Sequence, residues 1–440
     1  MWHPTQATVA TLAVGICVLA LGVLTGRGGI ALLGVPLVLS VLIGGDGRPV
    51  AATRATRDGT ENHDGAGRVC DRVRLESDAA ADVVHVRVSA AGYRAVEVVV
   101  PGGGTRDLTV RLGTRRTGPQ LAFDLVARAR SIADVAAEDV AALHVPERLV
   151  LPTATPLGRV PVATRLRGLT GPRTTRRLGD GTELRDIHPM APGDSWRRVD
   201  WRATARVSPA LDAVQVRRTL ATGDATAVLV LDSRDEVGPD LHTWRGSGPL
   251  RVDEPTSLDL ARNAAASVAK ALLPAGDRVG LEDLAHRRRP LPPSTGQRHL
   301  RRILHGLALA SPVGEPTRTV TLSSGATAVR PPRVPADAIV YLFTTLLDDV
   351  PAQLVGQWQE RSIPVVVIDT LPTVRPVPQA HLHLAWQIMS MERADRIRGL
   401  EAAGVPVIAW TGTGSRSPAH RFEVMSRATT HQAPTPGGRR

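Results

Sequence analysis

The chain has 440 residues, of which 42% are apolar and 22% charged, so it can bury the cores of two or three domains and is not a disordered chain. Its formal net charge of +12 suits an anionic partner such as an acidic protein, a phospholipid surface or nucleic acid, although an alanine- and arginine-rich composition alone would also produce it. Aromatic residues make up only 3% of the chain, which leaves few stacking platforms for single-stranded nucleic acid, and no specific nucleic-acid partner is expected.

Two uncharged apolar runs open the chain, residues 7–24 and 28–45, with only a three-residue turn between them. As helices, each would be about 27 Å long, close to the thickness of a bilayer's hydrocarbon core. A signal peptide is the alternative for the first run, but Met1 to Pro4 contain no lysine or arginine that would form a basic n-region. We therefore expect residues 1–45 to form a transmembrane hairpin that contacts the lipid bilayer through residues 7–45.

The distribution of arginine predicts the orientation of this hairpin. Arg48, Arg54 and Arg57 follow the second run, whereas the turn contains only Arg27. Because basic residues favour the cytoplasmic side, we expect a two-pass protein of the cell membrane whose soluble domains are cytoplasmic.

The next part of the chain predicts a linker and then a β domain. Residues 46–67 are rich in Gly, Asp, Thr and Arg without apolar periodicity, which is typical of a linker. Residues 68–151 contain short segments such as VCDRVRLES and DVVHVRVSA, in which apolar and polar residues alternate between glycine-rich turns. This pattern predicts a small antiparallel β-sandwich.

The larger C-terminal part predicts an α/β domain over residues 223–412. Buried-strand runs such as TAVLVLD and PVVVID alternate with helical segments such as SLDLARNAAASVAKALL, which predicts a doubly wound parallel sheet. Ligands of such sheets bind at the carboxyl ends of the strands, so the residues just after Leu231 form a candidate site. Residues 413–440 are rich in Pro, Gly, Thr and Arg and are expected to form a flexible tail.

Between these two parts, residues 152–222 are expected to be a linker that carries one dense segment, PMAPGDSWRRVDWRATARV. Pro192, Gly193 and Asp194 predict a turn. If the residues that follow form a strand, Arg197, Val199 and Trp201 share one face, and Arg198, Asp200 and Arg202 share the other.

This strand would make Asp200 the centre of an ion-pair network and would let Trp201 stack on a guanidinium. Two interpretations remain open: the network is a structural staple between the two domains, or it is an exposed patch that binds an anion or a partner. A buried Trp201 predicts a loss of about 3 kcal/mol or more when it is replaced by alanine.

The run GDGTELRDIHPMAPGDSWRRVDWRATARVSPALDAVQVRR closely resembles the signature of the bacterial family known as domain of unknown function fifty-eight. The positions that match the most specific part of that signature are Pro192, Gly193, Asp194, Arg197, Arg198, Val199, Asp200, Trp201, Thr204, Ala205 and Arg206. The resemblance implies an N-terminal transmembrane hairpin, a β-rich region and a von Willebrand factor type A-like α/β domain. It also implies two partners, a MoxR-type AAA ATPase and a transglutaminase-like membrane protein.

Von Willebrand type A domains often bind a divalent ion through Asp-x-Ser-x-Ser after the first strand, because a carboxylate and two hydroxyls are hard oxygen ligands. The corresponding loop here reads Asp232, Ser233, Arg234, Asp235, Glu236. Arg234 and Glu236 replace the two serines, and Thr344 and Thr345 stand where the family commonly has Asp.

A guanidinium at a ligand position opposes a dication, so we expect no metal and no cofactor. In that case Asp232 is a helix N-cap or the partner of a nearby arginine. A shifted ion site formed by Asp232, Ser233 and Asp235 is the alternative.

Other motifs carry little chemistry. His381 and His383 would share one face of a strand but have no acidic or cysteine neighbour, and Arg287 to Arg289 form a basic surface run. The chain contains no P-loop, zincin or nucleophile-elbow motif, so no enzymatic activity is expected.

We expect a membrane-anchored cytoplasmic interaction module that acts as an adaptor or scaffold with a MoxR-type AAA ATPase. The alternatives are a salt-sensitive binder of anionic lipid or nucleic acid, and a hydrolase with an unrecognised site.

Overall fold

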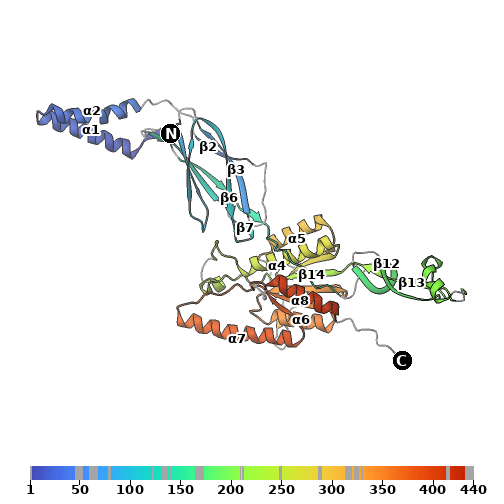
Figure 1. Ribbon diagram of the computed structural model, residues 1–440. Coiled ribbons are helices and arrows are strands. Elements are labelled where there is room, and N and C mark those ends of the chain that lie inside the picture. The colour runs from blue at the N-terminus through green and yellow to red at the C-terminus, as the bar shows by residue number, and fades with distance from the viewer. Residues whose placement is uncertain are drawn as a thin grey trace. The chain divides into compact units, whose positions relative to one another are not determined.

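The computed structural model describes residues 2–44, 53–58, 68–77, 81–120, 123–130, 136–138, 140–163, 173–208, 210, 213–246, 250–285, 290–312, 320–321, 327–328, 331–412 and 417–431. The chain forms two compact units. The β unit comprises Met1–Arg115 and Pro119–Val150, and the α/β unit comprises Arg116–Gly118 and Leu151–Arg440. Figure 1 labels the elements of both units.

The β unit begins with two apolar helices, α1 (Gln6–Leu24) and α2 (Gly28–Gly44), which pack against each other. Glycines allow the close approach, because a Cβ atom on Gly22 would lie only 2.3 Å from the backbone nitrogen of Ala31. Within the described residues, α1 is long and apolar enough to cross a membrane, and α2 is a shorter apolar helix. The chain therefore has an N-terminal apolar helix, as the sequence predicted.

Two antiparallel sheets form most of the rest of the β unit. One has the order β1-β9-β8-β4-β5, with β10 also paired to β8, and the other has the order β2-β3-β6. The alternating apolar residues of both sheets share one core, to which Val73, Val86 and Leu125 contribute. The strands are β1 (Trp2–Pro4), β2 (Arg54–Asp58), β3 (Arg68–Ser77), β4 (Val83–Ser89), β5 (Val96–Pro101), β6 (Gly104–Gly113), β8 (Phe123–Arg130), β9 (Ala136–Glu138) and β10 (Ala141–Val145). β7 (Gly118–Gln120) and β11 (Arg148–Val150) form a separate two-stranded sheet.

Strand β2 lies inside the stretch that the sequence predicted to be a linker, residues 46–67. It pairs with β3 from Arg54↔Glu76 to Asp58↔Arg72. The side chain of Arg57 explains why this polar strand is held, since its Nε donates to the buried carboxylate of Asp71 at 3.0 Å. Apart from buried Thr53, the remainder of the predicted linker lies outside the described residues.

The α/β unit contains a six-stranded sheet with the order β16-β15-β14-β19-β20-β21. All neighbours are parallel except β16, which runs antiparallel to β15. Every residue of β14 and β19 is buried, because both faces of these strands are covered. The strands are β14 (Thr226–Leu231), β15 (Arg278–Asp283), β16 (Leu291–Ser294), β19 (Ala338–Thr344), β20 (Val365–Asp369) and β21 (Val407–Ala409). β17 (Val320–Thr321) and β18 (Thr327–Ala328) form a short antiparallel pair.

Helices cover both faces of this sheet (Figure 1). Helices α4 (Ser257–Leu272) and α5 (Gln297–Leu309) contribute to the core on one face, and α6 (Val350–Glu360) and α7 (Ala380–Ala402) to the core on the other. The unit also contains three short 3-10 helices, η1 (Trp196–Arg198), η2 (Leu241–Gly246) and η3 (Leu273–Ala275). The architecture is the α/β region that the alternation of strand and helix patterns predicted.

The chain beyond residue 412 was predicted to be a flexible tail, but the structure forms helix α8 (Pro418–His431) there. Phe422 is fully buried in the same core as α4, and its ring centroid lies 6.2 Å from that of Tyr341. The prediction of a flexible tail is wrong for this segment, because the buried ring of Phe422 anchors an otherwise polar helix to the core. Residues 432–440 lie outside the described part of the chain.

The first part of the predicted linker over residues 152–222 is packed rather than free. The amides of Thr153 and Thr155 donate to the side chains of Asn263 and Ser267 on α4, each at 2.8 Å. Val160 is buried in the core of the α/β unit. These contacts make residues 151–163 part of that unit.

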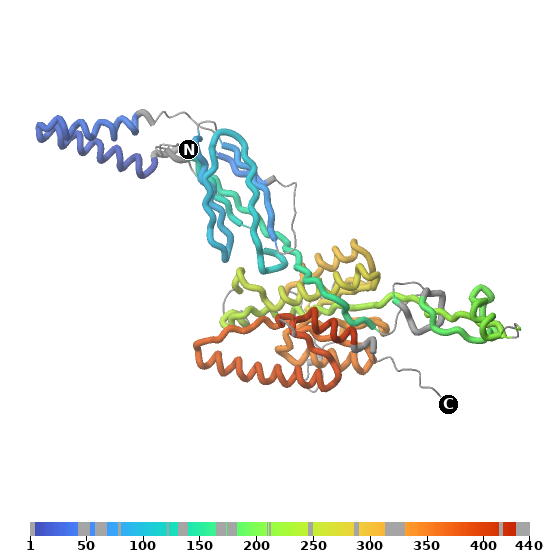
Figure 2. The backbone as a smooth tube through the Cα atoms, in the orientation of Figure 1, coloured from blue at the N-terminus to red at the C-terminus, as the bar shows by residue number. Residues whose placement is uncertain are grey.

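The second part of this stretch is an antiparallel ribbon of β12 (Arg173–Pro189) and β13 (Gln215–Gly223). The register shifts three times along the ribbon, so the pairing is irregular. Figure 2 shows the ribbon extending away from the helices and sheet of the α/β unit. Its tip carries η1 and helix α3 (Trp201–Val207), which are the residues of the family signature.

Candidate functional site

The signature segment forms the ribbon tip, by which we mean residues 190–208. Gly193 has a φ of +96°, a conformation that favours glycine and closes the Pro-Gly-Asp turn. Asp194 completes the turn, since one carboxylate oxygen accepts from the amide of Ala191 at 2.9 Å. The sequence therefore predicted this turn from the residues that form it.

Beyond the turn the structure differs from the predicted strand, because Trp196–Arg198 form η1 and Trp201–Val207 form α3, and only Val199 and Asp200 between them are extended. Asp200 is the N-cap of α3, and its Oδ1 accepts from the amide of Ala203 at 2.9 Å. The expected alternation of Arg197, Val199 and Trp201 with Arg198, Asp200 and Arg202 on two strand faces is wrong. An aspartate is compatible with a helix N-cap or with an extended chain, and here the hydrogen bond from the amide of Ala203 stabilises the N-cap conformation.

Asp200 is also not the centre of an ion-pair network, since no ion pair between described residues involves it. Its backbone ties the tip to the ribbon instead. The amide of Asp200 donates to the carbonyl of Gln215 at 2.9 Å, and the amide of Gln215 donates to the hydroxyl of buried Thr204 at 2.9 Å. Caps and ribbon contacts hold this short helix in place.

The large side chains of the tip face solvent. Trp196 is 68% exposed and Trp201 is 61% exposed, so Trp201 does not belong to a core. Arg197, Arg202 and Arg206 are exposed as well, and none of them pairs with an acidic residue in the described part of the chain. The tip thus presents two indole rings and several uncompensated positive charges.

The second candidate site is the carboxyl edge of the sheet, where β14 and β19 end side by side. Asp232 follows β14, and both of its carboxylate oxygens accept from Arg234, from Nε at 2.8 Å and from Nη2 at 2.9 Å. The same guanidinium donates to Asp348 at 2.7 and 3.1 Å. Thr344 adds a hydroxyl hydrogen bond of 2.8 Å to Asp232.

Burial of Arg234 opposes its charge, but the hydrogen bonds to Asp232 and Asp348 outweigh that effect and raise the pKa of the guanidinium. Arg234 is therefore a permanent cation between two carboxylates. The donor set does not fit a divalent ion, because the guanidinium already occupies both oxygens of Asp232 and would repel a second positive charge.

The other residues of the shifted ion site point elsewhere. Ser233 donates to Asp283 at the end of β15, and Asp235 is exposed. Asp369 at the end of β20 pairs with Arg393 of α7, whose Nε also donates to the carbonyl of Thr345 at 2.8 Å. No three of the described His, Cys, Asp and Glu side chains form a group that could hold a metal ion.

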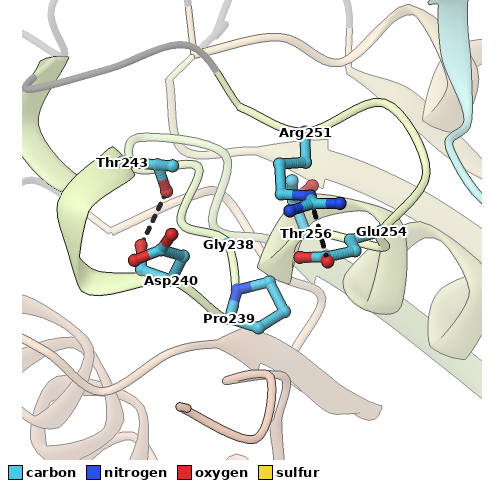
Figure 3. A pocket seen from close by; sticks show the side chains of 7 residues that line it. All are labelled: Gly238, Pro239, Asp240, Thr243, Arg251, Glu254 and Thr256. Atoms are coloured by element: carbon cyan, nitrogen blue, oxygen red, sulfur yellow. Dashed lines mark hydrogen bonds and ion pairs between the residues drawn. The ribbon is translucent and has the colours of Figure 1, made fainter. Parts of the chain in front are cut away.

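A small polar hollow lies in the loop that follows β14 (Figure 3). Its lining residues are Gly238, Pro239, Asp240, Thr243, Arg251, Glu254 and Thr256. The charged groups in it are already engaged, since Glu254 pairs with Arg251 at 3.2 Å and also with Arg375. Its side chains include neither a histidine nor a cysteine.

The histidine side chains lack a paired nucleophile in the described part of the chain. No imidazole ring there is hydrogen-bonded to a serine, threonine or cysteine side chain. His381 and His383 lie in the first turn of helix α7 and are exposed, so the prediction that they share a strand face is wrong. Arg287 to Arg289 lie outside the described residues.

Several residues of these sites escaped the sequence analysis. Trp196 and Asp348 carried no periodicity that would distinguish them, and only the fold brings Asp348 to Asp232. Asp283 and Asp369 could have been found, because each is the last residue of a strand in a parallel sheet.

Comparison with known families identifies the class of protein to which this geometry belongs. Residues 186–372 match the model of the family described as Protein of unknown function DUF58. The match spans the ribbon tip and most of the α/β sheet, and it supports the family that the signature predicted. No curated protein and no solved structure matches the chain.

Proposed function

We propose that this protein is a membrane-anchored interaction module that acts as an adaptor or scaffold, without enzymatic activity of its own, and that the ribbon tip is its docking surface. The observation that carries the proposal is the exposure of Trp196 and Trp201 within the family signature. The family resemblance supports a MoxR-type AAA ATPase as the partner and a transglutaminase-like membrane protein as a further one.

The composition of the tip fits protein docking. Trp and Arg are the residues most enriched among those that dominate binding energy, because they bury a large rigid area or form several hydrogen bonds at once. The indole rings bring apolar area, and the exposed Arg197, Arg202 and Arg206 bring positive charge. We therefore expect an acidic surface with apolar hollows on the partner.

The tip is also preorganised for binding. Asp194 fixes the turn, Asp200 caps α3, and Thr204 ties α3 to β13. A docking surface that is ordered before binding loses less conformational entropy when the partner arrives.

For the α/β unit we propose a von Willebrand factor type A-like fold. Two features support this assignment, a parallel sheet that winds in both directions from β14 and an antiparallel edge strand, β16. Its carboxyl edge is the second surface on which a partner could rest.

We further propose that α1 and α2 form a two-pass hairpin with the soluble parts in the cytoplasm. The close glycine contacts between the helices and the single charged residue in their turn, Arg27, support this topology. Cysteine substituted for Thr25 should be labelled by an impermeant maleimide from outside intact cells, and cysteine substituted for exposed Met391 should not. The reverse pattern would refute the orientation.

The docking proposal is tested by affinity capture of the full-length protein from detergent-solubilised native membranes with a non-hydrolysable ATP analogue present. Mass spectrometry should find an AAA ATPase among the captured proteins, and Trp196→Ala/Trp201→Ala should reduce its recovery at least tenfold. Met391→Ala is the matched control, because Met391 is 68% exposed on α7, away from the tip. Equal recovery with both variants would refute docking through the tip.

Anionic lipid is a second candidate ligand, favoured by the same exposed arginines and tryptophans. Vesicles containing phosphatidylglycerol should then bind the full-length protein in detergent at low salt and release it as salt rises. Binding that the Trp196→Ala/Trp201→Ala variant retains in full would remove the tip from this interaction.

A further inference from the structure

The carboxyl edge of the sheet contains one position at which a ligand is expected on topological grounds. The chain passes from β14 to β15 on one side, and β19 pairs with β14 on the other, so the order of the strands reverses between β14 and β19. In open α/β sheets a crevice forms outside the carboxyl ends of the strands at such a point, and ligands bind there.

In this protein the crevice is occupied by the chain itself. Asp232 extends from β14 and Asp348 follows β19, and the guanidinium of Arg234 lies between their carboxylates. The four hydrogen bonds measure 2.7 to 3.1 Å, and the side chain of Asp232 is only 6% exposed. We call Asp232, Arg234 and Asp348 the arginine clasp.

The clasp leaves little for another cation to bind. Both oxygens of Asp232 accept from Arg234, and one of them also accepts from Thr344. The neighbouring carboxylates are engaged in the same way, Asp283 by Ser233 and Asp369 by Arg393. A divalent ion would have to displace an internal cation that is already hydrogen-bonded to both of its acidic neighbours.

We propose that Arg234 is a built-in cation that replaces a divalent ion at this position, so that the carboxyl edge of the sheet stays assembled, and recognises any partner, without a metal. The inference concerns the α/β unit alone and does not depend on docking through the ribbon tip. It has a direct consequence: a small neutral side chain at position 234 should free the oxygens of Asp232, Asp348 and Thr344 for a hard cation such as Mg²⁺ or Mn²⁺.

The test is a titration of the full-length protein in detergent with Mn²⁺, followed by the electron paramagnetic resonance signal of the free ion. The unchanged protein should bind no Mn²⁺ that depends on Asp232. Arg234→Ser should gain one bound ion per chain, and Arg234→Ser/Asp232→Asn should lose it. Arg398→Ser is the matched control, because it removes an arginine that pairs with Asp395 on the surface of α7 and should create no site.

Thermal unfolding provides a second readout. A chelator should not change the melting temperature of the unchanged protein. Arg234→Ser should have a lower melting temperature, which should rise again when Mg²⁺ is added. An ion present at 100 times its Kd should shift the unfolding equilibrium about 100-fold toward the folded state.

Two results would overturn the proposal. One is Mn²⁺ binding by the unchanged protein that disappears in Asp232→Asn. The other is a folded Arg234→Ser variant that binds no ion, because the guanidinium would then not stand in a cation position.

If Arg234→Ser does not fold, Arg234→Lys and Arg234→Gln replace it. The lysine keeps a positive charge and should remain indifferent to Mg²⁺, whereas the glutamine removes the charge and should melt higher when Mg²⁺ is present. An identical response of these two variants would contradict the role of the charge.

Discussion

The buried carboxylate of Asp259 accepts several hydrogen bonds within the α/β unit, and its removal tests how that unit is stabilised. Asp259 has no exposed surface, and its oxygens accept from the amide of Thr117 at 2.6 Å and from the amide of Thr256 at 2.9 Å. Two arginines lie beside it, with Arg116 Nε at 2.6 Å and Arg262 Nη1 at 3.3 Å. Asp259 is also the third residue of α4 and forms a capping box with the N-cap residue Thr256.

The expected cost of Asp259→Ala follows from these contacts. Removing one partner from a buried ion pair costs about 3–5 kcal/mol, because the other charge is left uncompensated. Burial already lowers the pKa of Arg262, and the negative charge of Asp259 opposes that effect, so the guanidinium depends on this carboxylate. The loss of the cap accompanies the loss of the ion pair, and since the two are not additive we expect about 4 kcal/mol in total.

The measurement is urea unfolding of the full-length protein in detergent, followed by tryptophan fluorescence, to which the fully buried Trp358 contributes. Asp395→Ala is the control, because that residue forms an exposed ion pair on α7 and should change the free energy of unfolding by less than about 1 kcal/mol. A loss below about 1 kcal/mol for Asp259→Ala as well would refute the reasoning. An intermediate loss for Asp259→Asn, which keeps one acceptor oxygen, would separate the hydrogen bonds from the charge.

Three further predictions concern other parts of the molecule. Phe422→Ala should destabilise the α/β unit by about 3–5 kcal/mol in the same urea assay, because the ring is fully buried, and a loss below about 1 kcal/mol would mean that α8 is not part of the core. Burial raises the pKa of Tyr341, so the folded protein keeps a phenol proton that the unfolded chain releases above pH about 10. The free energy of unfolding should therefore fall as the pH rises beyond that point. In melting curves recorded at several pH values, Tyr341→Phe should remove this part of the pH dependence. Asp71→Ala should destabilise the β unit by about 3–5 kcal/mol, because the buried carboxylate pairs with Arg57 and Arg148, and urea unfolding monitored by circular dichroism at a strand wavelength would show an unchanged midpoint if those pairs are not formed.

The patterns that succeeded are those set by local chemistry. A long uncharged apolar run forms a buried or membrane-spanning helix, so α1 was predictable. Strands that are buried on both faces appear in the sequence as continuous apolar stretches, so the parallel sheet of the α/β unit was predictable as well. The Pro-Gly-Asp turn was predictable for the same reason, since Gly193 and Asp194 carry the conformation and the hydrogen bond themselves. The signature was sufficient to predict the family whose model residues 186–372 match.

The patterns that failed depend on contacts between distant residues. The sequence around Asp200 fits a strand or a capped helix, and the hydrogen bonds to Gln215 and Thr204 accompany the helical outcome. Likewise, the C-terminal segment lacks a strong apolar face, and only the place that the core offers to Phe422 makes it an ordered helix.

The sequence by itself thus determined the apolar N-terminal helix, the α/β alternation, the family and the misfit of Arg234 with a metal-binding loop, because each of these lies within a short stretch of chain. Only the tertiary structure decided that Trp196 and Trp201 face solvent at the tip of a ribbon, and that Asp348, more than a hundred residues further along the chain, joins Asp232 around Arg234. Exposure and long-range pairing depend on how distant parts of the chain fold together, and no local pattern of residues determines them.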